Sequence, residues 1–285
     1  MGFRGRKKNY KRGASGSLCV KTRIALVQTP CALGDKAENI RRMERCLDKV
    51  EADIYAFGEL FVTGYMCRDL LPRLAEDLEG KSIKRISGLA EERGVDIVFG
   101  MPTLDEEREG LIHNSALAAA SDGSLQRYDK MNLANFGPFE EGFFFTEGAS
   151  PAIFELGRKK IGLCICYDLF FSELAKRYAI EGTDALLCLS ASPSTSREQF
   201  ERMIPARAME NTMYALYANN VGTQLNMVFF GGSQANGPKG NQIAKARYFE
   251  EDAVVVEIDP QEIALARRMR PTIRDTGVPL ARSSD

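Results

Sequence analysis

The 285-residue sequence contains no tryptophan, a single histidine (His113) and no CxxC pair among its seven cysteines. One histidine excludes most histidine-rich metal sites, and cysteines without paired spacing indicate reduced thiols, as in a cytoplasmic protein. The sequence also lacks the GxSxG, GxxxxGK[ST], GxGxxG and HExxH motifs. Serine hydrolysis at a nucleophile elbow, phosphoryl transfer, hydride transfer and zinc-dependent hydrolysis therefore each lack their usual residues.

Neither sign of charge dominates, because 38 lysines and arginines face 39 aspartates and glutamates, for a formal net charge of −1. This balance argues against a nucleic acid or an acidic membrane as partner. No apolar run approaches the roughly 20 residues that a membrane-spanning helix needs. With 44% hydrophobic and 27% charged residues, the composition is that of a globular protein with a sizeable core.

The first residues, MGFRGRKKNYKRGASGSL, are basic and contain no acidic residue. No apolar segment follows them, so they are not a secretory signal, and their composition predicts a flexible tail over residues 1–20. The tail is either a basic arm with a partner or an overlong start to a protein that folds from near Val20. The strand-like TRIALVQ that follows favours the second interpretation, and we expect one domain over residues 21–285.

Apolar strands alternate with helical patterns along most of the chain, which predicts a single α/β domain with mixed sheets and helices on the outer faces. SDG and GR each separate two strand-like segments and predict antiparallel hairpins. Periodicity alone leaves open whether three or four layers are stacked. The principal expected strands are 23–28, 53–60, 95–100, 184–190 and 213–220, and the expected helices are 36–50, 81–93, 171–182 and 198–212.

Cys166 lies where the apolar strand IGLCIC meets the amphipathic segment that follows it. A helix N-terminus favours a nearby anion, and thiolates in such positions are good nucleophiles. A free cysteine is also often a small core residue, so this position alone leaves both interpretations open. Cys164 is two residues away on the same strand and points to the opposite face, so the two thiols cannot easily bind one metal.

A nucleophilic cysteine needs a base, and the sequence offers few. His113 opens the strand HNSALAAA, where we expect a hydrogen-bonded histidine at a strand end rather than a catalytic one. Glu59 ends the strand-like DIYAFGEL, and Lys130 ends SLQRYDK. These two are either solvated rim residues or groups that converge with Cys166 at one edge of the sheets, where sites of open α/β folds lie.

Four segments together resemble the carbon–nitrogen hydrolase (nitrilase) superfamily. GELFVTGY is similar to its glutamate motif, YDKMNL to its lysine motif and CICYDLFFSEL to its cysteine motif. The resemblance thus assigns a catalytic triad of Glu59, Lys130 and Cys166. FEEGFFFTEG resembles the segment with a supporting glutamate and assigns Glu141. HNSA and ARAMEN also fit, and the similarity runs over about residues 22–260 in the right order.

The resemblance implies a four-layer α-β-β-α sandwich that pairs through a twofold interface, hence a homodimer or a higher homo-oligomer. It also implies hydrolysis of a non-peptide carbon–nitrogen bond in a small linear amide, without a metal or organic cofactor. In that chemistry Glu59 is the general base and Cys166 the nucleophile. Lys130 and the backbone N–H of Tyr167 stabilise the oxyanion. We expect Glu141 to orient Lys130 or to bind the substrate amide.

The segment around the cysteine departs from parts of the superfamily. Nitrilases usually have Trp-Glu after the cysteine, whereas here Tyr167 and Asp168 follow, which argues against a true nitrilase. Many amidases and carbamoylases have Arg and Pro just before the helix glutamate, but Phe170, Phe171 and Ser172 occupy this region. A substrate carboxylate would therefore lack the arginine that could pair with it in those enzymes. We expect the wall of this site to be more apolar than theirs.

LANFGPFEEGFFF and GYMCRDLL resemble segments of the glutaminase domains of NAD synthetases. The alternatives are therefore a stand-alone glutaminase that supplies ammonia to a separate synthetase, an N-carbamoyl amidohydrolase, and a non-catalytic binding or scaffold protein of the same fold. As substrate contacts we expect Tyr65, Phe143, Ser190 and Ser192. Ser196, by contrast, is expected to cap the following helix, because Glu198 lies close behind it.

Overall fold

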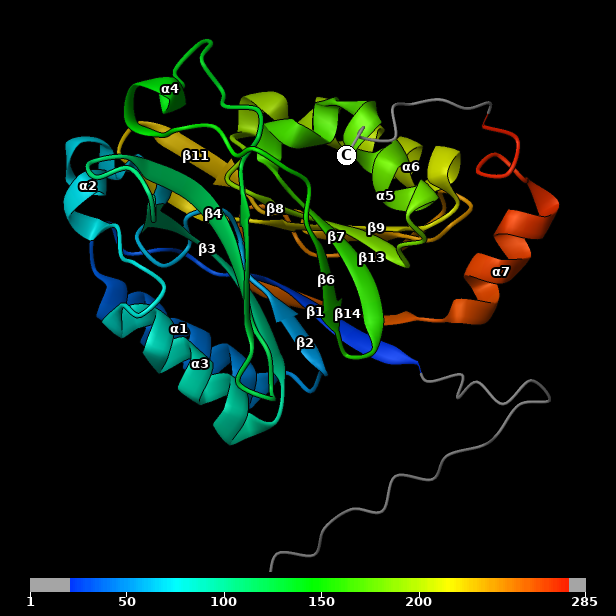
Figure 1. Cartoon of the computed structure of the whole chain (residues 1–285), viewed down its shortest axis with the longest axis horizontal. Coiled ribbons are helices and arrows are strands. Elements are labelled where there is room, and N and C mark those ends of the chain that lie inside the picture. Colours follow the sequence, from blue (N-terminus) through cyan, green and yellow to red (C-terminus); the bar gives the residue numbers. More distant parts are fainter. Residues whose placement is uncertain (1–20, 277–285) are drawn as a thin grey trace, which may run out of the picture.

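A computed structural model describes residues 21–276, in which two six-stranded sheets lie between layers of helices (Figure 1). The predicted tail over residues 1–20 lies outside the described residues. The first sheet has the order β14-β1-β2-β3-β4-β5. Its strands are β1 (Thr22–Gln28), β2 (Ile54–Ala56), β3 (Asp96–Leu104), β4 (Ile112–Ala119), β5 (Leu125–Asp129) and β14 (Asp252–Ile258).

The second sheet has the order β13-β12-β9-β8-β7-β6, and a separate two-stranded ribbon joins β10 to β11. The strands of this sheet are β6 (Ile153–Leu156), β7 (Lys159–Ile165), β8 (Ala185–Ser190), β9 (Tyr214–Asn219), β12 (Gln234–Asn236) and β13 (Gln242–Lys245). The ribbon consists of β10 (Val221–Gln224) and β11 (Met227–Phe230). Both large sheets mix parallel and antiparallel pairs, as the sequence predicts for an α/β domain with hairpins.

Helices α1 and α3 cover the outer face of the first sheet, and α5 and α6 cover the second (Figure 1). The helices are α1 (Lys36–Lys49), α2 (Leu71–Leu74), α3 (Lys81–Arg93), α4 (Glu141–Phe144), α5 (Ser172–Ile180), α6 (Arg197–Asn211) and α7 (Pro260–Met269). The 3₁₀ helices of the described residues are η1 (Tyr65–Leu70), η2 (Cys166–Phe170) and η3 (Ser194–Ser196). Within residues 21–276, no helix combines the length and the apolar character needed to cross a membrane.

Alternation along β1 shows how the sequence builds two cores. Ile24 and Leu26 belong to the core between the sheets, while Ala25 and Val27 belong to the core beneath α1 and α3. Successive side chains of a strand point to opposite faces, so a strand buried on both sides is apolar throughout. The predicted α/β sandwich with four layers is therefore confirmed.

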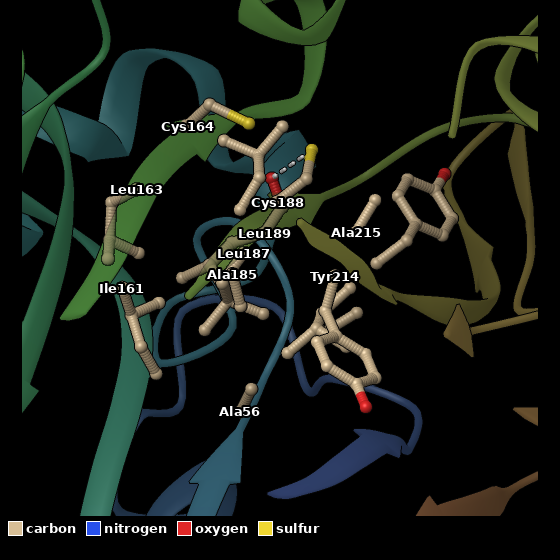
Figure 2. Close-up of a cluster of buried hydrophobic side chains, with 14 of the residues drawn as sticks. Ala56, Ile161, Leu163, Cys164, Ala185, Leu187, Cys188, Leu189, Tyr214 and Ala215 are labelled. Carbon is tan, nitrogen blue, oxygen red and sulfur yellow. Dashed lines mark hydrogen bonds between the residues drawn. The ribbon is translucent and has the colours of Figure 1, made fainter. Parts of the chain in front are cut away.

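The core between the sheets reaches the end of β7, where the candidate nucleophile follows. Figure 2 shows Ile161 and Leu163 of β7 beside Leu187 of β8, with Cys164 and Cys188 on neighbouring strands. All of these side chains are at most 1% exposed. The last residues of β7 are thus held in a close-packed layer, which fixes the position of the turn that begins at Cys166.

The helix predicted over 81–93 is α3, with the same boundaries. Two other predicted elements, both near the site, differ from the observed ones. The strand predicted over 53–60 ends at Ala56, because the chain then leaves the first sheet and the amide of Glu59 donates to Ser190 O across the two sheets at 3.2 Å. The helix predicted over 171–182 spans residues 172–180, and the separate η2 precedes it. Periodicity does not reveal such departures, since both follow from contacts between distant segments.

Candidate active site

The three residues of the predicted triad lie just beyond the ends of strands. Glu59 follows β2, Lys130 follows β5 directly, and Cys166 follows β7 directly. Glu141 is the first residue of α4, which belongs to the loop between β5 and β6. The structure therefore gathers at one end of the sheets four residues that are up to 107 positions apart in the chain.

Lys130 is the centre of a buried ion-pair cluster. Its Nζ donates to Glu59 Oε1 at 2.8 Å and lies 2.8 Å from each carboxylate oxygen of Glu141. Lys130 and Glu59 are fully buried, and Glu141 is 4% exposed. An ammonium and two carboxylates out of water require such close pairing, because an unpaired buried charge is very costly.

Glu59 is held by donors on three sides. Its Oε1 also accepts from Asn114 Nδ2 at 2.8 Å, and its Oε2 accepts from the amide of Ala191 at 2.8 Å. Gly58 allows this arrangement, since a Cβ there would lie 2.2 Å from Asn220 Oδ1. The neighbouring amide of Asn220 donates to Glu59 O. The carboxylate is therefore fixed in place by both sheets.

Cys166 has a backbone φ of +48°, a left-handed conformation that is strained for a residue with a side chain. It is 8% exposed, and its Sγ lies 3.6 Å from Ser192 Oγ. The strained turn ends β7 and starts η2 at the same residue, so the thiol leaves the sheet and lines a cavity. Strain of this kind persists only where the surrounding structure imposes it, and it is frequent at functional sites.

The charges of the cluster set the protonation of the nucleophile. Burial, followed by the negative charge of Glu59, raises the pKa of Cys166 well above its usual value, although Lys130 opposes this. Burial also raises the pKa of Glu59, against the effect of Lys130. Burial lowers the pKa of Lys130, but Glu141 and Glu59 outweigh it and raise this pKa overall. The resting site thus combines a thiol and an ammonium, and the thiol needs a base to react.

The cavity beside Cys166 has a volume of about 300 Å³. Its walls come mainly from the segment after β5, from η2 and from the start of α6. Glu141 and Cys166 contribute the polar end near the ion-pair cluster. The lining residues are Ala134, Phe136, Phe139, Glu141, Cys166, Tyr167, Phe170, Pro193, Ser196, Gln199 and Phe200.

The predicted oxyanion donor belongs to this cavity. Tyr167 lines it, and its backbone N–H is in the first turn of η2, where amides have no acceptor within the helix. The ring of Tyr167 packs against Phe136, with 4.9 Å between ring centroids. The geometry is thus compatible with the predicted role of this amide, which stays a prediction.

The expected substrate contacts lie elsewhere. Phe143 is 81% exposed and is not among the residues that line the cavity, contrary to its expected place in the wall. Tyr65 donates its hydroxyl to Glu141 Oε1 at 2.6 Å and acts through this carboxylate. Ser190 and Ser192 are fully buried and hydrogen-bond to each other at 2.6 Å behind Cys166. Tyr65, Ser190 and Ser192 are not among the residues that line the cavity, so their role as substrate contacts stays a prediction.

The sequence predicts structural roles for Ser196 and for His113. The structure contradicts the first prediction and confirms the second. Ser196 is at the N-cap position of α6, but its side chain makes no capping hydrogen bond and instead lines the cavity. The predicted capping role is therefore wrong. His113 has hydrogen-bond partners on both ring nitrogens, Asp105 Oδ2 and Thr146 O, each at 2.9 Å, which confirms a satisfied histidine at a strand end.

Asp168 is a supporting residue that sequence reasoning missed. Its buried carboxylate accepts from the backbone amide of Ile165 at 3.0 Å, from the hydroxyl of Tyr128 at 2.8 Å and from the amide of Asn132 at 2.8 Å. It thereby links the end of β7 to β5 and to the segment that follows Lys130. An aspartate two residues beyond the nucleophile is the only sequence signal for this role.

Arg207 was also missed, and it holds η2 from behind. Its guanidinium donates to Leu169 O at 2.9 Å and to Phe170 O at 3.0 Å. It belongs to the segment ARAMEN, which fitted the resemblance without an assigned role. As for metals, no group of three or more His, Cys, Asp or Glu side chains within residues 21–276 has the arrangement of a metal site.

The two mixed sheets with helical outer layers define the fold as that of the nitrilase superfamily. A CN-hydrolase superfamily protein of Xanthomonas campestris superposes with a TM-score of 0.84 and 25% identity, over 92% of this chain and 99% of that one. A family model described as carbon-nitrogen hydrolase matches residues 23–268. The chain belongs to the carbon–nitrogen hydrolase family, as its four sequence motifs predicted.

Relatives with different described activities are similar to the chain at comparable levels. A probable nitrilase of Schizosaccharomyces pombe is 31% identical over 243 residues, covering 83% of this chain and 88% of that protein. An omega-amidase of Xenopus tropicalis is 30% identical and covers 89% and 94%. A glutamine-dependent NAD(+) synthetase of Aquifex aeolicus is 30% identical over 87% of this chain but only 43% of its own length. The predicted similarity to synthetase glutaminase domains is thereby confirmed.

Proposed function

We propose that the protein hydrolyses the carbon–nitrogen bond of a small linear amide through a cysteine thioester, with Glu59, Lys130 and Cys166 as the catalytic triad. The observation that carries the proposal is the buried cluster in which Lys130 joins Glu59 and Glu141, next to a strained Cys166 that opens on a cavity. The similarity to an omega-amidase supports an amide as the substrate.

In the first half-reaction, the Cys166 sulfur attacks the amide carbon and its proton passes to Glu59. The C–N bond then breaks as Glu59 returns that proton to the nitrogen, which leaves as ammonia. The oxyanion of the tetrahedral intermediate accepts from the Lys130 ammonium and the Tyr167 amide. Loss of one such donor typically costs about 3–4 kcal/mol of transition-state stabilisation.

In the second half-reaction, Glu59 takes a proton from a water molecule, whose oxygen attacks the thioester carbon. The C–S bond breaks, the sulfur recovers the proton from Glu59, and the carboxylic acid leaves. Lys130 stays protonated throughout, since Glu141 and Glu59 hold it in the charged form. Glu141 keeps Lys130 in position and thus acts as a positioning residue.

Two other enzymatic functions compete with this proposal. The synthetase similarity favours a stand-alone glutaminase that delivers ammonia to a separate synthetase. An N-carbamoyl amidohydrolase would use the same triad and release ammonia and carbon dioxide. A non-catalytic protein of this fold is the remaining alternative, and the retention of all four predicted charged and nucleophilic side chains argues against it.

Ammonia release from a panel of glutamine, short aliphatic amides, N-carbamoyl amines and nitriles separates these functions, with Cys166→Ala as the control. Release from an aliphatic amide that is lost in the variant supports the proposal. Release confined to glutamine or to a carbamoyl amine replaces it with the matching alternative. Release by neither protein from any compound refutes an amidase.

We also propose that the protein is cytoplasmic and forms a homodimer or a larger homo-oligomer. The six cysteines in the described part of the chain are free thiols, which suits a reducing compartment. Sedimentation equilibrium of the full chain tests the assembly: a mass of 31.6 kDa would contradict a dimer, and twice that value would support it.

A further inference from the structure

The cavity beside Cys166 is bounded by a continuous arc of aromatic rings. Phe139 packs on Phe136, Phe136 on Tyr167, Tyr167 on Phe170, and Phe170 on Phe200. Successive ring centroids are 4.9–5.6 Å apart. All five residues line the cavity, whose volume of about 300 Å³ is at the lower end of ligand pockets. The space therefore suits a small acyl group that makes apolar contacts.

No lysine, arginine or histidine is among the described residues that line this cavity. Three arginines close to its lining in the chain are engaged elsewhere, and one of them, Arg202, pairs with Glu198 at 3.1 Å. The guanidinium of Arg197, next to Ser196, lies 5.1 Å from the centroid of the Tyr248 ring. Arg207 donates to two backbone carbonyls of η2 and to Glu210. A carboxylate on the acyl group would therefore find no cation along the aromatic wall.

The charged end of the cavity also disfavours an anion. The ion-pair cluster beside Cys166 contains the ammonium of Lys130, but this group is already paired with Glu59 and Glu141. One of these carboxylates, Glu141, lines the cavity itself. A second negative charge in this space would be both unpaired and repelled, and burial of an unpaired charge is strongly unfavourable.

From this wall we infer that the acyl group of the substrate is neutral and apolar, and that amides with a carboxylate on the acyl chain are poor substrates. The inference rests on the proposed amide hydrolysis and narrows its substrate class. It distinguishes the chain from an enzyme for the mono-amide of a diacid and from a glutaminase, because both of those substrates bring a carboxylate into the site.

A matched pair of amides tests the inference with the full-length protein. In 4-methylpentanamide an isopropyl group takes the place of the carboxylate of succinamate, so the two have the same chain length and branching but differ in charge. We expect kcat/KM for the neutral amide to exceed that for succinamate by at least about 100-fold, since the site leaves the anion unpaired. A ratio within tenfold, or a preference for succinamate, would overturn the inference and leave amide hydrolysis standing.

The second test introduces a positive charge into the lining of the cavity and measures the preference between the two amides. Gln199 is exposed and lines the cavity, so Gln199→Arg adds a cation without opening the core. We expect this variant to shift the ratio of kcat/KM at least about tenfold toward succinamate, by pairing its carboxylate. The control Gln199→Met should leave the ratio within threefold of the unchanged protein. An unshifted ratio in Gln199→Arg would show that a missing cation does not set the selectivity.

Binding to the Cys166→Ala variant separates failure of this inference from failure of the proposed reaction. A ligand that binds the folded state raises the Tm. A rise with 4-methylpentanamide and none with succinamate at equal concentration supports the inference, even if neither compound releases ammonia from the unchanged protein. The reverse pattern, equal rises or no rise with either compound would overturn it.

Discussion

Replacement of Lys130 by methionine tests whether the buried ammonium holds the site together. The side chain of Lys130 is fully buried, and its Nζ lies 2.8 Å from Glu59 Oε1 and from Glu141 Oε1. Lys130→Met keeps a long unbranched side chain but removes the charge and the N–H donors to the two carboxylates. Two carboxylates then share a buried site with no cation between them, and removal of one partner from a buried pair typically costs about 3–5 kcal/mol.

The repulsion between the two carboxylates accounts for much of this cost. Because each oxygen is 2.8 Å from the same Nζ, the two oxygens are no more than about 5.6 Å apart. At this separation and an effective dielectric constant of about 20, two unit charges repel by about 3 kcal/mol. A repulsion of that size raises the pKa of one of the two carboxyls, so the folded variant binds an extra proton.

The pH dependence of stability follows from the sign of this shift. In the folded variant the carboxyl pKa lies above its unfolded value, so the folded state binds the extra proton more tightly. The associated stability is present below the unfolded pKa and is lost as the pH rises through the folded pKa. The deficit of Lys130→Met relative to the unchanged protein is therefore expected to be about 1–3 kcal/mol larger at pH 7.5 than at pH 5.5.

Urea unfolding of both proteins at the two pH values measures the deficit. Lys84→Met is a matched control, because Lys84 pairs with Glu79 at 3.0 Å on the surface, where the two side chains are 63% and 81% exposed. It should cost less than about 1 kcal/mol at either pH. A deficit for Lys130→Met that is equally small, or that does not change between the two pH values, would refute the reasoning.

Three further outcomes are expected. Because burial raises the pKa of Glu59 above 4.5 despite Lys130, the acid limb of kcat/KM should have its midpoint above pH 4.5, and a midpoint below that value would exclude Glu59 as the base. Gly58→Ala should lower the free energy of unfolding by about 1–3 kcal/mol in urea, since its Cβ would overlap Asn220, whereas an unchanged value would show that the junction can relax. Asp168→Asn should reduce kcat at least about tenfold with a smaller change in KM, because it loosens the turn at Cys166; an equal rise in KM would point instead to a general loss of structure.

The sequence predicts best the strands and motif residues that depend only on neighbouring positions in the chain. The apolar run in TRIALVQ predicts a strand, and β1 occupies this segment, buried along nearly its whole length. Glu59, Lys130 and Cys166 each stand where an apolar strand ends, and their motifs are local as well. The family and the fold are therefore predictable from short segments, and so is the meeting of these three residues at one end of the sheets.

The walls of the site depend on how distant loops pack, and local patterns do not contain this information. FEEGFFFTEG offers several aromatic residues at equivalent-looking positions, yet Phe143 is 81% exposed while Phe136 and Phe139, a few residues earlier, line the cavity. Ser190 and Ser192 are not among the residues that line the cavity, and their role as substrate contacts stays a prediction. They lie beside Cys166, where the end of β8 contacts Glu59 in the segment that follows β2.

The most direct test of the account is a mass measurement on the protein during turnover. Acid quenching with a hydrolysed amide such as 4-methylpentanamide, followed by proteolysis and mass spectrometry, should reveal one acyl group on the peptide that contains Cys166. The same experiment on Cys166→Ala should give no acylated peptide and no ammonia. An acyl group on another residue, or ammonia release that survives in Cys166→Ala, would contradict the assignment of Cys166 as the nucleophile.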